Sequence, residues 1–187
     1  MNSFYDETEL QKIGFKKFGR DVRISRKASI YSPNKISIGD HVRIDDFCIL
    51  SGKIAMGSYI HISAYTALYA KYEIQIDDFV TISGRVLVYS QSDDYSGNYM
   101  TNPMIPEKFT KVTGGKVVFK KHSIIAAGCI IFPAVIIGEG AAIGAMSLVN
   151  TNIDPWTINV GIPAKKIKDR KKKILQLEKK IVLSQIR

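Results

Sequence analysis

Bulky apolar residues recur at every sixth position in the second half of this chain. They are Phe119, Ile125, Ile131, Ile137, Ile143 and Val149, and four places after each of the first five stands a small or β-branched residue: Ser123, Cys129, Val135, Ala141 and Ser147. A helix repeats every 3.6 residues and a strand every two, so a period of six fits neither. It is typical of a coil of short parallel strands that meet at tight corners, with each sixth side chain pointing inward.

The same period extends back toward the N-terminus. It is loose at Ile24 and Ile30 and then regular at Ile38, Ile44, Leu50, Met56, Ile62 and Leu68; after a two-residue excess it resumes at Ile76, Ile82 and Val88. Three hexads form one triangular coil, so coils begin near residues 38, 56, 76, 119 and 137. The pattern predicts an all-β fold, a parallel β-helix over residues 24–154.

One long segment interrupts the repeat. From Ile76 to Phe119 the chain runs 43 residues where one coil needs 18, so about 25 residues, roughly 91–116, are predicted to leave the β-helix as a loop. The loop is polar and aromatic with two prolines and is not of low complexity, which favours a functional role.

The two ends of the chain are predicted to carry short helices. Residues 1–23 contain helical spacing between Glu7 and Phe18 and are expected to cap the first coil, because a bare end would expose core. Residues 155–187 form a C-terminal segment in which Ile174, Leu177 and Ile181 have helical spacing among lysines. This basic helix is expected to pack on the coil end or on a neighbouring molecule; a membrane-surface helix is the alternative.

The net charge of +10 is concentrated at the C-terminus. Residues 165–187 hold ten Lys and Arg against Asp169 and Glu178, which leaves only +2 for the remainder and argues against a surface built for nucleic acid. No run of 18 apolar residues and no signal-peptide pattern occurs, so we expect a soluble cytoplasmic protein. Cys48 and Cys129 fall at small inward positions and are expected to be core residues.

Two of the three histidines occupy equivalent corners of different coils. His41 and His122 share a column with Tyr59 and Phe79, and three coil steps of ~4.8 Å place them about 14 Å apart. We therefore expect stacked corner side chains and no metal site, unlike the β-helical carbonic anhydrases, whose zinc needs three converging histidines.

With these features the chain resembles the hexapeptide-repeat acyltransferases, especially the galactoside, maltose and xenobiotic acetyltransferases. The resemblance covers about Ile38 to Lys168: coil lengths of 18, 20 and 18 residues, the loop after Val88, and the closing sequence IDPWTINVGIPAKKIK. It implies a left-handed β-helix, a homotrimer with active sites between subunits, and acetyl-CoA as the acyl donor.

The resemblance also exposes a difference at the catalytic position. The family's general base is a histidine at the start of the loop, and Asp93 stands there in this chain. A carboxylate, with an ordinary pKa of about 3.9, is a poorer base than imidazole, with about 6.5. Either Asp93 acts as the base, with its pKa raised by burial and by the like charge of Asp94, or another residue is the base. His61 is the candidate for that other residue. Our hypothesis is that Asp93 of one subunit orients His61 of the next; alternatively, His61 only binds substrate or is merely exposed.

The remaining site residues are also carried over from the family. Ser63, Lys71 and Asp94 are expected at the acceptor, and the cation Lys71 favours an acidic acceptor such as a nucleotide diphosphate-sugar or an acidic glycan. CoA is expected to contact Ala127, Ala145, Asn150, Thr151, Lys165 and Lys168. A backbone N–H near Ala127 would stabilise the oxyanion. Trp156 either supports the adenine or covers the end of the core.

These features predict an acetyl-CoA-dependent acetyltransferase for a sugar hydroxyl or amine, acting in surface-polysaccharide (O-antigen or capsule) synthesis. The choice between O- and N-transfer stays open, although an amine needs little basic help and the missing histidine tilts the balance toward an amino sugar. Two alternatives remain: a catalytically inactive trimeric β-helix that binds or scaffolds, and nucleic-acid binding through the basic tail.

Overall fold

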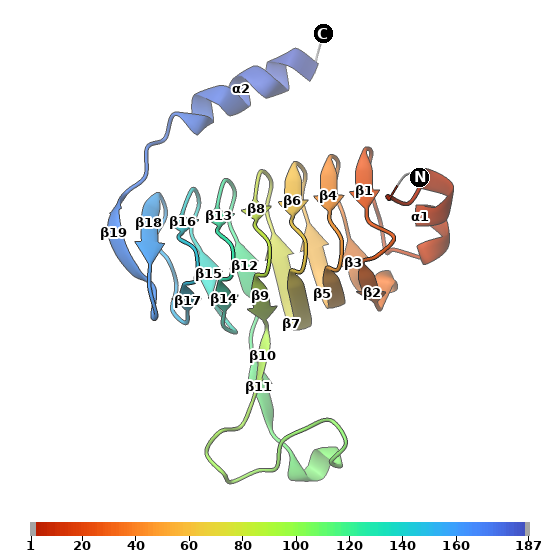
Figure 1. The fold of residues 1–187 in the computed structure, drawn as a ribbon, viewed down its shortest axis with the longest axis vertical. Helices are drawn as coiled ribbons and strands as arrows, with labels where there is room; N and C mark the ends of the chain where they lie inside the picture. Colours follow the sequence, from red (N-terminus) through yellow and green to blue (C-terminus); the bar gives the residue numbers. More distant parts are fainter. Residues whose placement is uncertain (1–2, 186–187) are drawn as a thin grey trace.

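The computed structural model describes residues 3–185 as a β-helix with a helix at each end and one long arm (Figure 1). One sheet contains seven parallel strands from successive coils and an antiparallel strand at its edge. In spatial order the strands are β1 (Val22–Ile24), β4 (Val42–Ile44), β6 (Ile60–Ile62), β8 (Thr81–Ile82), β13 (Ile124–Ile125), β16 (Ala142–Ile143), β18 (Thr157–Val160) and β19 (Lys165–Asp169).

A second sheet bends around a corner and forms the other two sides of the coil. β5 pairs with both β2 and β3, and β7 pairs with both β9 and β12, because β5 and β7 each run through the bend. Gly52 has φ 96° at this bend, where a Cβ would meet the Ala70 carbonyl. The strands are β2 (Ser29–Tyr31), β3 (Ile36–Ser37), β5 (Ile49–Met56), β7 (Ala67–Ile76), β9 (Leu87–Tyr89), β12 (Val117–Phe119), β14 (Ile130–Ile131), β15 (Ile136–Ile137) and β17 (Leu148–Val149).

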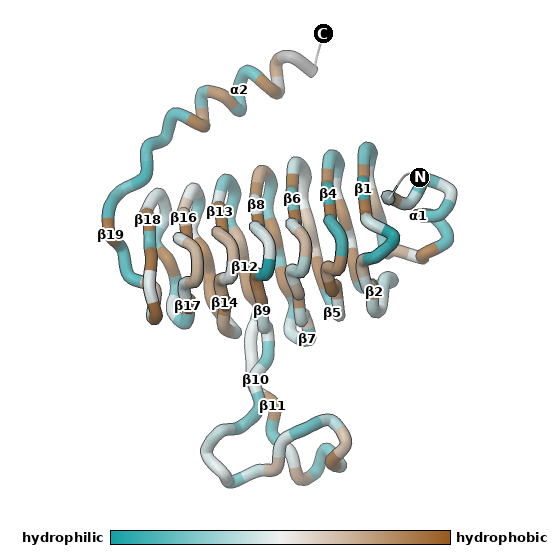
Figure 2. The backbone as a smooth tube through the Cα atoms, viewed as in Figure 1, coloured by the Kyte–Doolittle hydropathy of each residue, from teal (hydrophilic) through white to brown (hydrophobic). Residues whose placement is uncertain are grey.

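The sixth residues fill the interior, which confirms the predicted β-helix. From Ile38 onward every inward residue named above is buried, and Ile62 lies in register with Ile44 on one side and Ile82 on the other. Ile30, where the repeat is loose, is only half-buried. Figure 2 shows the resulting contrast between the apolar strands of the coils and the largely polar C-terminal segment. Like side chains therefore stack in continuous columns along the axis.

Cys48 and Cys129 are core residues, as predicted. Both are fully buried, and their Sγ atoms donate to the backbone carbonyls of Ser63 (3.2 Å) and Gly144 (3.1 Å) respectively. Burial raises the pKa of the Cys48 thiol to about 11, so it stays protonated at neutral pH. Neither thiol has the thiolate character of a nucleophile.

The predicted aromatic column forms along one corner. His41, Tyr59, Phe79 and His122 stack with ring centroids 4.8, 4.7 and 5.2 Å apart. Each has φ between 56° and 62°, a left-handed conformation that non-glycine residues adopt at a cost, which stacking between the rings helps to offset.

Trp156 ends this column. Its ring lies where a Cβ of Gly140 would be, and its centroid is 6.4 Å from that of His122. Only glycine leaves room for this approach. The two roles predicted for Trp156, support of the adenine and cover of the end of the core, stay predictions.

The N-terminal helix α1 (Glu7–Ile13) is shorter than its pattern indicated. Asp6 and Glu9 form a reciprocal capping box at its start, and Gly14 ends it in the left-handed conformation, so Phe18 lies outside it. Leu10 is buried against the core of the first coils.

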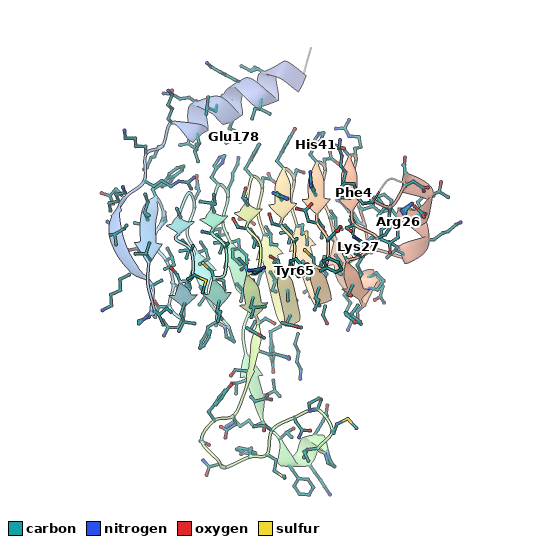
Figure 3. All side chains as sticks on the ribbon, in the orientation of Figure 1. Phe4, Arg26, Lys27, His41, Tyr65 and Glu178 are labelled. Carbon is teal, nitrogen blue, oxygen red and sulfur yellow. The ribbon has the colours of Figure 1, made fainter. Side chains whose placement is uncertain are left out.

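The C-terminal helix α2 (Ile174–Gln185) turns back over the aromatic corner (Figure 1). Glu178, labelled in Figure 3, joins it to the β-helix through Lys121 Nζ (2.5 Å) and His122 Nε2 (2.8 Å). Leu177 and Ile181 remain 47% and 41% exposed, so the apolar residues described in α2 pack only in part on the coil. Neither helix within residues 3–185 is long and apolar enough to span a membrane.

Adjacent isoleucines on β15 provide a matched test of inward packing. Ile137 is fully buried and Ile136 is 41% exposed. We expect Ile137→Ala to lower the free energy of unfolding by about 2–5 kcal/mol, because it opens a cavity in a stacked column. Ile136→Ala should change it by less than about 1 kcal/mol. Urea unfolding of both variants measures this, and equal losses would contradict the assigned register.

The anchor of α2 should depend on pH. Hydrogen bonding from Lys121, with a second bond from His122, holds the pKa of Glu178 below its ordinary value of 4.5. A lowered folded-state pKa means that the anchor is complete above about pH 4.5 and is lost as the pH falls through the folded value. Amide-exchange protection of α2 should therefore be lower at an acid pH well below 4.5 than at pH 6. Glu178→Gln should show low protection at both values; an unchanged wild-type profile would refute the anchor.

Candidate active site

The predicted loop is an arm carried on a two-stranded antiparallel hairpin. β10 (Gln91–Asp93) pairs with β11 (Val112–Gly114), and the short 3-10 helix Glu107–Phe109 lies further out, as Figure 1 shows. Gly114 packs against the Tyr72 ring so closely that a Cβ would collide with it, and Tyr72 Oη donates to the Val112 carbonyl at 3.2 Å. The base of the arm is therefore held against β7.

Glu73 fixes the same junction by charge. Its carboxylate binds Lys116 Nζ (2.8 Å), just after the arm, and Lys53 Nζ (2.6 Å) from the neighbouring coil. Hydrogen bonding from Lys116, followed by that from Lys53, lowers the pKa of Glu73. The carboxylate stays ionised at neutral pH, so the arm leaves the coil from a fixed point.

A pocket lies where the arm leaves the coil. It has a volume of about 400 Å³ and is lined by residues of β9, β10, the arm just after β10, β14 and the turn after β14: Tyr89, Gln91, Ser92, Asp93, Tyr95, Ile130, Phe132 and Pro133. The coil contributes mainly apolar and aromatic side chains, and the arm contributes polar side chains together with Tyr95. Such a lining suits an amphipathic ring with hydroxyl or amino substituents.

The phenol of Tyr89 belongs to the coil wall of this pocket. Burial, with the nearby Tyr69 and Tyr95, raises the pKa of Tyr89, so its hydroxyl is neutral at pH 7. Its ring stacks on that of Tyr69 with centroids 5.2 Å apart, one coil away. The wall is thus rigid and uncharged.

Asp93 lines the pocket and its side chain is exposed. Asp94, the next residue, accepts hydrogen bonds from the Ser96 backbone N–H (3.1 Å) and hydroxyl (2.6 Å) and shapes the turn that follows. Only Asp93 of the predicted acceptor and catalytic residues lies in this pocket.

His61 lies elsewhere, on β6 in the other sheet, and has a carboxylate partner from its own chain. Its Nε2 is 2.8 Å from Asp45 Oδ2 and 3.4 Å from Ser63 Oγ. Partial burial acts to raise the pKa of Asp45, but hydrogen bonds from Arg43 and His61 outweigh it and the pKa is lowered. An ionised Asp45 orients the imidazole, as the carboxylate does in a catalytic triad.

The structure of one chain brings Ser63 to His61 but does not bring Asp93 or Lys71 there. Asp93 is on the arm, and Lys71 is exposed on β7. Within the described chain the partner of His61 is Asp45, which sequence reasoning missed. A pattern did exist, because Asp45 follows inward Ile44 as Ser63 follows Ile62 and Ser83 follows Ile82.

The predicted donor residues gather toward the C-terminal end of the β-helix. Ala127 and Ala145 are exposed at one corner of adjacent coils, where the Met146 backbone N–H donates to the Ala127 carbonyl (2.9 Å). Asn150 and Thr151 are exposed just after β17, and Lys165 and Lys168 are exposed on β19. Among residues 3–185, no group of three or more His, Cys, Asp or Glu side chains has the geometry to hold a metal ion.

Comparison with known proteins places the chain among sugar acyltransferases, although it matches no protein-family profile. It is 49% identical to dTDP-4-amino-4,6-dideoxy-D-glucose acyltransferase of Escherichia coli, over 94% of this chain and 93% of that protein. It is 26% identical, over 81% of each chain, to an Escherichia coli K12 protein, WbbJ, assigned as a lipopolysaccharide biosynthesis O-acetyl transferase.

A solved structure gives the same result. The chain is 56% identical to the N-acyltransferase AntD from Bacillus cereus, crystallised with dTDP-4-amino-4,6-dideoxyglucose and coenzyme A. The TM-score is 0.96, with 98% of this chain and 99% of that one covered. The chain has the hexad columns and the single arm, and its sequence matches these enzymes over nearly its whole length. It is therefore a member of the hexapeptide-repeat β-helix acyltransferases that act on sugars.

Proposed function

We propose that this protein transfers an acyl group from acyl-CoA to the amino group of a dTDP-linked amino-deoxy sugar, with acetyl-CoA as the expected donor. The observation that carries the proposal is the sequence identity of 49% and 56% to two such enzymes over nearly the whole chain. The Bacillus cereus enzyme has also been crystallised with 3-hydroxybutyryl-CoA, which favours a donor groove open to acyl chains longer than acetyl.

A spacing in that enzyme supports Asp93 as a site residue and adds Ser83. Crystal structures of that enzyme include variants in which a serine is replaced and variants in which an aspartate is replaced. The aspartate lies ten positions after the serine in its chain. In this sequence only Ser83 and Asp93 form a serine–aspartate pair with that spacing. Ser83 follows Ile82 in the same column as Ser63, one coil along from His61. We infer that the reacting amine lies between the Asp93 side of one subunit and this polar column of another.

The chemistry needs little from the protein. The amine lone pair attacks the thioester carbonyl carbon, a C–N bond forms, and the resulting oxyanion collapses with cleavage of the C–S bond. The nitrogen loses one proton to a base, for which Asp93 and His61 are the candidates, and the CoA thiolate is protonated on release. A backbone N–H near Ala127 would stabilise the oxyanion.

The donor site is carried over from the family. Ala127 and Ala145 leave the corner open to the pantetheine arm, Asn150 and Thr151 would lie beside the adenosine, and Lys165 and Lys168 would bind its phosphates. Ser63, Lys71 and Asp94 remain candidates for the acceptor side. The arm would reach a neighbouring subunit in a homotrimer, which would work in the cytoplasm, since its polyanionic substrates do not cross membranes. We further propose a role in surface-polysaccharide synthesis, the process to which WbbJ is assigned.

A thiol-release assay tests the function directly. Acetyl-CoA with dTDP-4-amino-4,6-dideoxyglucose should release CoA at kcat/KM of roughly 10⁴ M⁻¹s⁻¹ or more. The matching sugar nucleotide with a hydroxyl in place of the amine should react at least tenfold more slowly. The absence of release with both acceptors would favour a binding protein without catalysis, and faster reaction of the hydroxyl sugar would establish O-transfer.

Two substitutions separate the candidate bases. We expect Asp93→Asn to lower kcat about 100-fold, because the amide accepts no proton, and His61→Ala to lower it less. The reverse order would assign the base to His61. A His61→Ala variant with wild-type oligomeric state and wild-type kcat would exclude His61 as the base, and the equivalent result for Asp93→Asn would exclude Asp93.

A further inference from the structure

Gln91 lies beside Asp93 in the arm pocket and has no role in the chemistry above. The two residues are at alternate positions on β10, so their side chains are on the same side of the strand, about 6.6 Å apart along it. Both line the pocket, together with Tyr89 and Phe132. A molecule that fills this pocket therefore lies beside both residues.

The side-chain oxygen of Gln91 is buried without a hydrogen-bond donor in the described part of the chain. Buried acceptors are nearly always satisfied in folded proteins. One other side-chain atom among the described residues shares this condition, the hydroxyl of Ser123, which is enclosed at an inward corner. Gln91 differs because the rest of its half-buried side chain lines a pocket, so a rotation of the amide presents Oε1 to a ligand there.

We propose that Gln91 Oε1 accepts a hydrogen bond from an O–H or N–H group of the acceptor sugar and so determines specificity for that sugar. The inference rests on the proposed function. Asp93 and Gln91 together present two acceptors at a spacing close to the width of a pyranose ring with its substituents. Tyr89 and Phe132 offer aromatic surface for the C–H faces of that ring.

The charge of the pocket selects the sugar over the nucleotide. Asp93 is the charged residue among the eight that line it, and none of the eight is Lys or Arg. A carboxylate repels the diphosphate and attracts an amine. The sugar end of the substrate therefore occupies this pocket, and the diphosphate lies outside it.

The test compares Gln91→Met, which keeps the length of the side chain and removes its acceptor, with Gln91→Glu, which keeps acceptor oxygens. We expect Gln91→Met to lower kcat/KM for dTDP-4-amino-4,6-dideoxyglucose roughly 5- to 150-fold, since it leaves a sugar donor unpaired. Gln91→Glu should lose less. Gln75→Met is the matched control, because Gln75 lies on β7 outside this pocket and its amide already donates to Asp77 (2.6 Å).

Two further measurements distinguish a ligand contact from a structural one. The Tm of the free protein should not fall in Gln91→Met, because the substitution removes an unpaired buried acceptor, and dTDP alone should bind with unchanged Kd in calorimetry. A lower Tm or an altered oligomeric state would mean that protein groups satisfy Gln91, and an equal loss of dTDP affinity would move the contact to the nucleotide. Either result overturns the proposal, as does an unchanged kcat/KM.

The proposed function can fail separately. If the wild type releases no CoA with this sugar, calorimetry with the same sugar nucleotide still tests Gln91. Weaker binding by Gln91→Met, with dTDP binding unchanged, would support the sugar contact without catalysis, and equal binding would refute it.

Discussion

Everything in this protein depends on the parallel backbone hydrogen bonding between successive coils. It places each residue directly beside its counterpart one coil away, as Ile62 lies between Ile44 and Ile82. The inward columns then bury apolar side chains, and the corners repeat with residues in the same left-handed conformation. Because the register is fixed, polar residues in equivalent positions of different coils also meet. The contact of Asp45 with His61 is a product of this register.

The arm is compatible with this order because its two ends meet. The Gly115 backbone N–H donates to the Ser90 carbonyl at 3.0 Å, so the coil continues into β12 almost as if the arm were absent. Glu73 and Tyr72 then hold the hairpin where it leaves. The pocket arises from this junction, since the strand that exits the coil faces the aromatic side chains that remain in it. Rigid β-helix and projecting arm are the two parts from which a catalytic site can be built.

The sequence by itself determined the β-helix, the inward residues from Ile38 onward, the buried cysteines and the aromatic column. These follow from a period of six, in which the environment of each residue depends mostly on its position within the coil. The resemblance to the acyltransferases followed from the same period and from the one interruption, and the comparisons confirm it. The sites predicted for Ala127, Lys165 and the other CoA residues stay predictions, because they concern a ligand and neighbouring subunits.

Only the tertiary structure decided which polar side chains meet. Asp45 meets His61, and Glu178 reaches back to His122 across more than fifty residues. It also limited α1 to Ile13 and left Leu177, Ile181 and Leu183 of α2 exposed. The physical reason is that polar contacts depend on direction and distance between rotamers of distant segments, whereas apolar burial in a solenoid depends on periodicity alone.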